Sequence, residues 1–217
     1  DLKLSNKAGH KFPSGYPSRR AFVEFVVLDE NLDTLFKSGI LSSGYRLFEH
    51  DATYEPHYNL INNESQVQIY EMVMADVNGN KTTVLERAKE PLKDNRLPPI
   101  GFTTSHFTYD TTLIAGEALV DSDFNNDGQE GTGTDEIHYH VPLNGYSGEV
   151  TTSARIYYQP VPPLWNEEMF AYNSAEIDTF RNMYNEADGT PTLIAEKVVT
   201  GTPVGIIASE ENDWQVY

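Results

Sequence analysis

The sequence predicts a mainly β protein: an antiparallel β-sandwich with long loops and one helix in the C-terminal region. Three observations support this fold class. Aromatic residues reach 12% of the 217 residues although only 39% are hydrophobic, and aromatic side chains suit a half-buried pleated surface. Fifteen glycines and twelve prolines divide the chain into short segments. In the stretch 149–158, every second residue from Val150 to Tyr158 lies on one face of a strand.

Six segments have this strand character, namely 21–28, 66–74, 82–85, 137–141, 149–158 and 194–199. Several strands joined by long connections favour a sandwich over a βαβ arrangement. We therefore treat 1–217 as a single sandwich-like domain.

One helix is predicted over about 174–188. Asn173 and Glu176 resemble a capping box, in which side chains satisfy the free N–H groups of a helix start. Apolar residues then recur at helical spacing, and Gly189 with Pro191 ends the segment. We expect this helix to pack on one end of the sandwich.

Composition excludes several functions. The 33 acidic and 15 basic residues give a net charge of −18, which disfavours nucleic acid and an anionic membrane surface as partners. The absence of cysteine excludes disulfides, thiolate metal sites and a covalent c-type haem on this chain. No apolar run is long enough for a membrane span. A start on Asp1 rather than Met is expected of a processed or excised chain.

Sequence motifs of common enzymes are also absent. The chain contains no GxSxG, HExxH or GxxxxGK[ST] pattern. We therefore expect a protein that is not an enzyme.

The densest oxygen cluster is DSDFNNDGQE at 121–130. Part of it matches the first half of the calcium-loop pattern D-x-[DN]-x-[DN]-G. The pattern departs at its closing position, which is Thr134 instead of Glu, although Asp135 or Glu136 lies just beyond. We predict a calcium site here; the alternative is a solvated acidic turn. The candidate ligands are Asp121, Asp123, Asn125, Asp127, Gln129 and Asp135.

A second oxygen-rich turn, DVNGN at 76–80, is a weaker calcium candidate through Asp76, Asn78 and Asn80. A plain hairpin turn explains this segment better.

Histidines supply the candidates for a transition metal, because imidazole without thiolate suits copper, zinc, nickel or iron. His57 and His106 lie in two long polar loops, 43–65 and 86–112, that can converge at one end of a sandwich. His138 and His140 are an alternative pair on one face of a predicted strand. Two histidines at that spacing also occur without a metal.

Four segments in this order resemble a known family: NKAGHKFPSGYPSRR (6–20), YEPH with QVQIYE (54–57, 66–71), DVNGN (76–80) and KDNRLPPIGF (93–102). They are similar to the cysteine-free β-rich domain that follows the haem-binding part of secreted multihaem c-type cytochromes. They also resemble the surface copper-binding proteins of methanotrophic bacteria, of MopE and CorA type. The copper proteins hold copper(I) with two histidines and a kynurenine made from tryptophan. No tryptophan here adjoins a histidine, so the kynurenine is not carried over.

The resemblance implies a secreted or cell-surface bacterial protein, extracellular or periplasmic. In this hypothesis His57 and His106 bind copper(I), the acidic loop binds structural calcium, and the role is copper acquisition. A second hypothesis is a haem-free docking domain of an electron-transfer system, whose acidic surface attracts a c-type cytochrome or di-haem peroxidase. A third is a carbohydrate-binding sandwich.

Overall fold

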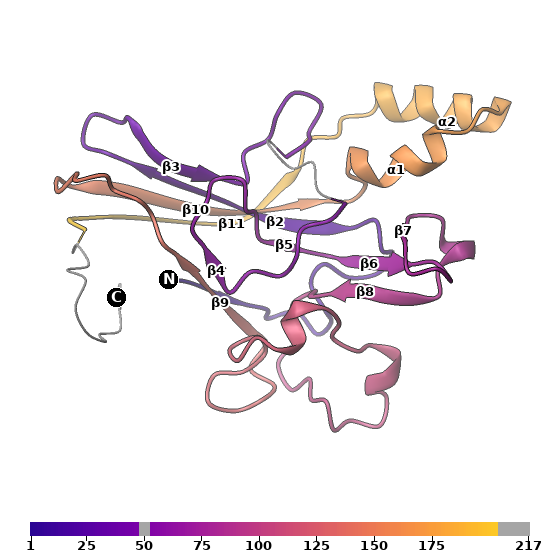
Figure 1. Cartoon of the computed structure of the whole chain (residues 1–217), viewed down its shortest axis with the longest axis horizontal. Coiled ribbons are helices and arrows are strands. Elements are labelled where there is room, and N and C mark those ends of the chain that lie inside the picture. The colour runs from indigo at the N-terminus through magenta and orange to yellow at the C-terminus, as the bar shows by residue number, and fades with distance from the viewer. Residues whose placement is uncertain (48–52, 204–217) are drawn as a thin grey trace.

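Strand β2 (Arg20–Leu28) lies at the centre of the largest sheet, and most of its side chains are buried. The computed structural model describes residues 1–47 and 53–203. β2 pairs antiparallel with β10 (Val150–Gln159) along its whole length and with β3 (Thr34–Ser38) on its other edge (Figure 1).

Two further strands complete this sheet. β11 (Thr192–Gly201) pairs antiparallel with β10, and the short β5 (Ile69–Tyr70) pairs with the N-terminal part of β2. The strand order is β11-β10-β2-β3, with β5 beside β2. β11 lies at the edge of this strand order, and all ten of its residues are exposed. Among the described strands, β11 pairs with β10 only.

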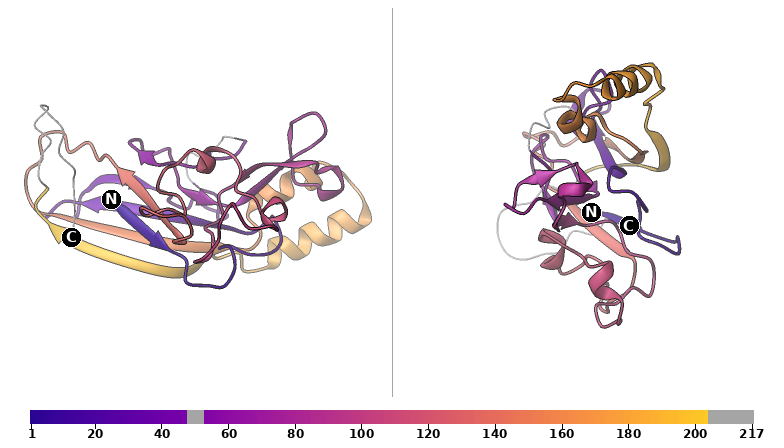
Figure 2. Two further views of the ribbon diagram at one scale, coloured as in Figure 1. Left: turned by 90° about the horizontal axis from the view of Figure 1, so that it is seen from below. Right: turned by 90° about the vertical axis from the view of Figure 1, so that its right-hand side faces the viewer.

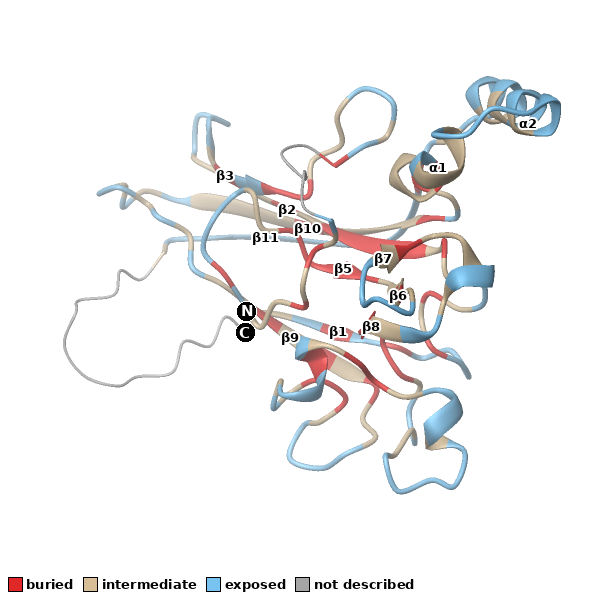
Figure 3. Ribbon diagram, turned by 45° about the vertical axis from the view of Figure 1, so that its right-hand side comes forward, coloured by how far each residue is buried: buried red, intermediate tan, exposed pale blue. Residues whose placement is uncertain are grey.

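A second sheet covers one face of the first. It consists of β1 (Leu2–Ser5), β9 (Thr134–Tyr139) and β4 (Leu60–Ile61), in the order β1-β9-β4. β1 runs antiparallel to β9, whereas β4 runs parallel to it. Buried side chains from the two sheets form one core cluster, and Figure 3 shows the buried stretches of β2 and β9 in red. Its members include Leu4, Val23, Phe25, Val27, Phe36, Ile61, Ile137 and Ala154.

A third, small antiparallel sheet has the order β7-β6-β8. It contains β6 (Met72–Ala75), β7 (Lys81–Thr82) and β8 (Glu90–Asp94). Three short 3₁₀ helices lie in the connections: η1 (Leu85–Arg87), η2 (Tyr109–Thr111) and η3 (Glu117–Leu119).

The helices α1 (Pro163–Phe170) and α2 (Ala175–Glu186) lie together at one end of the molecule (Figure 2). Within the part of the chain that is described, neither is long and apolar enough to cross a bilayer. The cap of α2 is Ser174, whose side chain accepts a hydrogen bond from the N–H of Ile177. The prediction placed the cap one residue early, at Asn173.

The predicted fold class is confirmed: the chain is mainly β, with antiparallel sheets packed as a sandwich. The parallel β4–β9 pair is a local exception. The predicted strand 66–74 is two strands, β5 and β6, in different sheets. The break is at Glu71, whose N–H donates to Oδ1 of Asn95 instead of to a neighbouring strand.

The sequence missed α1, because Pro162 occupies its cap position and no capping side chain marks the start. It also missed the short strands β1, β3, β4 and β8. β4 lies inside the expected loop 43–65 and β8 inside the expected loop 86–112. Part of the first loop, 48–52, is outside the described residues.

Gly39, directly after β3, provides a test of how tightly β3 packs on β2. Gly39 has φ +71°, and a Cβ there would lie 2.0 Å from the carbonyl oxygen of Val23. Gly79 has φ +82° with no atom within 4 Å of that position, so Gly79→Ala carries only the conformational strain of about 1–2 kcal/mol. We expect Gly39→Ala to cost more than about 4 kcal/mol in urea unfolding. Equal losses in the two variants would contradict this packing.

Candidate metal centre

Three side chains of types that can ligate a metal lie close together: His57, Asp121 and Asp135. Their ligand atoms all lie within 4.8 Å of one another. His57 precedes β4, Asp121 follows η3, and Asp135 belongs to β9. Nε2 of His57 is 3.0 Å from Oδ2 of Asp121 and 3.7 Å from Oδ1 of Asp135. The three side chains are 1%, 3% and 0% exposed, so the group is closed to solvent.

Two amide side chains orient the His57 ring. Nε2 of Gln68 lies 2.9 Å and Nδ2 of Asn95 lies 3.1 Å from Nδ1 of His57. The amide oxygens are already engaged, because Gln68 accepts from the N–H of Tyr58 and Asn95 from that of Glu71. Nδ1 is therefore an acceptor. Consequently Nε2 carries the ring hydrogen and donates it to Asp121.

Asp135 has one satisfied and one unsatisfied oxygen. Oδ2 accepts hydrogen bonds from the hydroxyl of Tyr70 and from Nε2 of Gln68. Oδ1 is buried and has no hydrogen-bond partner among the described residues. Burial raises the pKa of Asp135 to about 6, even though the hydrogen bond from Tyr70 favours the ionised form. The unsatisfied oxygen faces His57 and leaves a place for a cation or a proton.

Asp121 is better supplied with donors. Its Oδ1 accepts from Nδ2 of Asn59 at 2.9 Å and from the N–H of Asp123 at 3.2 Å, while Oδ2 faces His57. Burial alone would raise its pKa, but the hydrogen bonds from His57, Asp123 and Asn59 outweigh burial and lower it. Asp121 is therefore the ionised member of the centre and Asp135 the one that is easily neutralised.

An aromatic ring covers the centre on one side. The ring of Phe124, itself buried, packs edge-on against His57 with centroids 5.0 Å apart. With one imidazole nitrogen and carboxylate oxygens, the centre can hold a divalent cation. Without a cation it can hold one proton on Asp135.

The other residues predicted as calcium ligands lie apart from this centre. Asp127 is exposed and forms an ion pair with Lys3. Asn125 is buried but bonds the backbone, accepting from the N–H of Gly133 and donating to the oxygen of Phe102. Gln129 is exposed.

Asp123 points to the other side of β9 from the centre. Its Oδ1 accepts from the N–H of Glu136, and its Oδ2 lies 3.8 Å from Nε2 of His138. Of the six predicted calcium ligands, Asp121 and Asp135 therefore meet, and they meet a histidine that was predicted to bind copper.

The two predicted copper ligands differ in their surroundings. His57 is buried, whereas His106 is exposed and its Nδ1 lies 2.8 Å from the hydroxyl of Thr108. Neither group of three or more metal ligands found among residues 1–47 and 53–203 includes His106.

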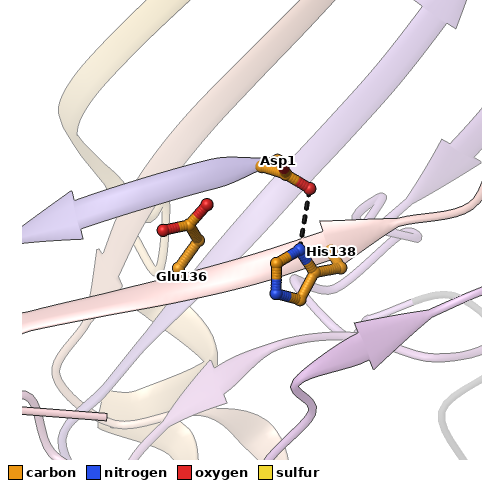
Figure 4. Close-up of side chains that lie close together, drawn as sticks. All are labelled: Asp1, Glu136 and His138. Atoms are coloured by element: carbon orange, nitrogen blue, oxygen red, sulfur yellow. Dashed lines mark hydrogen bonds and ion pairs between the residues drawn. The ribbon is translucent and has the colours of Figure 1, made fainter. Parts of the chain in front are cut away.

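His138 belongs to a second group, with Asp1 and Glu136, at the surface. Figure 4 shows Nδ1 of His138 joined to Asp1, with Glu136 beside them on β9. The Nδ1–Oδ1 distance is 2.7 Å. His140 follows β9 and is exposed. This surface group lacks the buried, unpartnered oxygen of the inner centre.

The turn at 76–80 is a hairpin connection between β6 and β7. Oδ1 of Asp76 accepts from the N–H groups of Asn78 and Asn80 at 2.8 and 2.9 Å. These hydrogen bonds lower the pKa of Asp76. The preference for a hairpin turn is confirmed.

Sequence reasoning missed the residues that orient the centre: Gln68, Tyr70 and Asn95. All three are fully or almost fully buried. One sequence feature could have found them: Gln68 is a polar residue between the apolar residues Val67 and Ile69, and all three are buried. A buried polar residue in such a run needs a partner, and here the partners are His57 and Asp135.

No family model matches the chain, and no curated protein matches it. Among solved structures, it is similar to a penta-heme cytochrome c552 from Thermochromatium tepidum, with a TM-score of 0.46 and 18% identity. The match covers 88% of this chain and 32% of the cytochrome, so the chain spans about a third of that protein's length. The resemblance to cytochrome-associated domains thus has a distant structural counterpart that carries no inference about function. The comparisons do not support the resemblance to MopE and CorA.

Asp135 makes stability depend on pH in a defined direction. Its pKa is about 6 when folded and 3.8 ordinarily, so the folded protein holds the proton more tightly than the unfolded chain. Its stabilising contribution is complete below about pH 4 and is lost as pH rises through 6, by about 3 kcal/mol in total. We expect wild type to lose stability relative to Asp135→Asn over pH 4–7.5, measured by urea unfolding with a chelator present.

The control for this experiment is Asp127→Asn, which neutralises an exposed carboxylate outside the centre. The stability difference between wild type and Asp127→Asn should not show the pH dependence expected for Asp135→Asn. A difference between wild type and Asp135→Asn that stays constant with pH would contradict the raised pKa.

Proposed function

We propose that this chain is a metal-binding protein whose centre is His57, Asp121 and Asp135, and that the ion is a divalent transition metal, with Zn²⁺ the best match. The observation that carries the proposal is Oδ1 of Asp135, a buried carboxylate oxygen without a hydrogen-bond donor beside two other ligating groups. Native structures rarely leave a buried polar atom unsatisfied unless an ion, water or function explains it.

Charge supports the same conclusion. Two buried carboxylates beside a neutral imidazole are costly to ionise together, because burial penalises charge and like charges repel. A divalent cation would neutralise both carboxylates at once. A proton on Asp135 neutralises only one, and it is lost at neutral pH because the pKa is about 6.

The donor set favours zinc over the two metals expected from sequence. Zinc accepts imidazole nitrogen and carboxylate oxygen in four-coordinate sites. Calcium prefers six to eight oxygens, and copper(I) is selected by soft ligands or by paired imidazoles. The centre offers a single imidazole, from His57, and two carboxylates.

Binding competes with the hydrogen-bond network. The ion would replace the hydrogen on Nε2 of His57, and the ring would then carry its hydrogen on Nδ1, where Gln68 and Asn95 now donate. A carbonyl oxygen of one of these amides has to turn toward Nδ1, as ligating histidines usually donate to an oxygen. Affinity therefore depends on this rearrangement as well as on the three ligands.

The proposal is tested by titrating chelator-stripped full chain with Zn²⁺ against a chromophoric competitor. We expect one ion per chain, and Asp135→Asn, Asp121→Asn and His57→Ala should each weaken binding by more than about 100-fold, beyond the usual effect of removing an outer-shell partner. Circular dichroism would establish that each variant is folded.

Three matched variants separate this centre from the other candidates. Asp127→Asn removes a carboxylate of the acidic loop, His106→Ala removes the partner predicted for copper, and His138→Ala removes the surface group. All three should bind Zn²⁺ as wild type does. Binding that is lost in His138→Ala, or kept in Asp135→Asn, would overturn the proposal.

A further inference from the structure

We propose that a pocket between α1, η1 and the segment before β2 binds a neutral sugar ring. The pocket has a volume of about 390 Å³, within the range of about 300–1,000 Å³ that small-molecule sites occupy. It shares no residue with the metal centre, so this proposal does not depend on the proposed function.

Three aromatic side chains line the pocket: Tyr16, Trp165 and Tyr172. The rings of Tyr16 and Trp165 meet edge-to-face, with centroids 5.8 Å apart and planes at 70°. Tyr16 and Tyr172 are 54% and 52% exposed. Tyr16 comes from the segment before β2, whereas Trp165 and Tyr172 come from α1 and the turn after it. Together these rings expose apolar surface to a ligand instead of burying it in a core.

Polar groups stand beside the rings. The guanidinium of Arg87 lies 5.9 Å from the centroid of Tyr172, and its Nη1 is 3.1 Å from Oε1 of Glu168. Glu168 is held in turn by the N–H of Thr83 at 2.7 Å. Asn166, 3% exposed, forms part of the pocket wall, with its Nδ2 buried. The Arg87–Glu168 pair therefore places a fixed donor and a fixed acceptor beside the aromatic surface.

This combination selects among ligand classes. A pyranose has an apolar face of C–H groups that stacks on an aromatic ring, and hydroxyl groups that need donors and acceptors at its edge. An anionic ligand is disfavoured, because the charge of Arg87 is already matched by Glu168 and the protein carries −18. A quaternary ammonium ion, the usual ligand of an aromatic cage, is disfavoured because Arg87 already places a cation over Tyr172.

The experiment is calorimetric titration of the full chain with cellohexaose, chitohexaose, xylohexaose and mannohexaose, each at up to millimolar concentration. We expect binding of at least one of these hexasaccharides. Trp165→Ala and Tyr172→Ala should each weaken it by about tenfold, the effect of losing one stacked ring. Because Tyr172 is half exposed, its variant tests the pocket even if Trp165→Ala does not fold.

Two controls define the role of the rings. Tyr172→Phe keeps the ring and should keep most of the affinity. Phe107→Ala removes a ring that is 90% exposed and lies outside the pocket, so this variant should bind as wild type does. Absence of binding to all four hexasaccharides would overturn the proposal. So would binding that Trp165→Ala and Tyr172→Ala leave unchanged, or binding of tetramethylammonium without any hexasaccharide.

Discussion

The hydrogen bond between Nε2 of His57 and Oδ2 of Asp121 is the interaction on which the inner architecture depends. It joins a loop that precedes β4 to the turn that follows η3, beside Asp135 on β9. Removing charged groups from water is expensive, and the loss is recovered only when their remaining hydrogen-bonding capacity is satisfied. The surrounding residues donate hydrogen bonds to Asp121 and to Oδ2 of Asp135. Oδ1 of Asp135 receives none from the described residues.

The strands around the centre are arranged to supply these partners. Gln68 immediately precedes β5, and Asn95 immediately follows β8. The fully buried Lys93 donates to the carbonyl oxygen of Ile69 at 2.8 Å, as does Asn95, so the end of β8 is fixed against β5. The break between β5 and β6 at Glu71 also contributes, because the N–H of Glu71 donates a hydrogen bond to Asn95 and so orients it. The break in the strand at Glu71 thus helps to orient His57 through Asn95.

Sequence alone predicted the regular elements of this molecule. It named the three residues of the candidate centre, but it assigned them to two different metals and missed the residues that orient them. The local residue pattern found β2, β10 and α2, because each of these elements is long enough to carry such a pattern. Spacing could not unite His57 with Asp121 and Asp135, since the contacts join residues more than sixty positions apart and depend on the parallel β4–β9 pairing. The acidic excess misled in a similar way: Asp121 and Asp127 are close in sequence, yet one faces the interior and the other pairs with Lys3 at the surface.

The most direct test of the metal centre is NMR of the protein labelled with ¹⁵N in its histidine rings, recorded without metal and with one equivalent of Zn²⁺. In the ion-free protein, His57 should carry its hydrogen on Nε2, as the donors from Gln68 and Asn95 require. Zinc should replace that hydrogen, shift the Nε2 resonance and place the ring hydrogen on Nδ1. Zinc that binds while the His57 resonances stay unchanged, or that shifts His138 instead, would contradict a centre built on His57, Asp121 and Asp135.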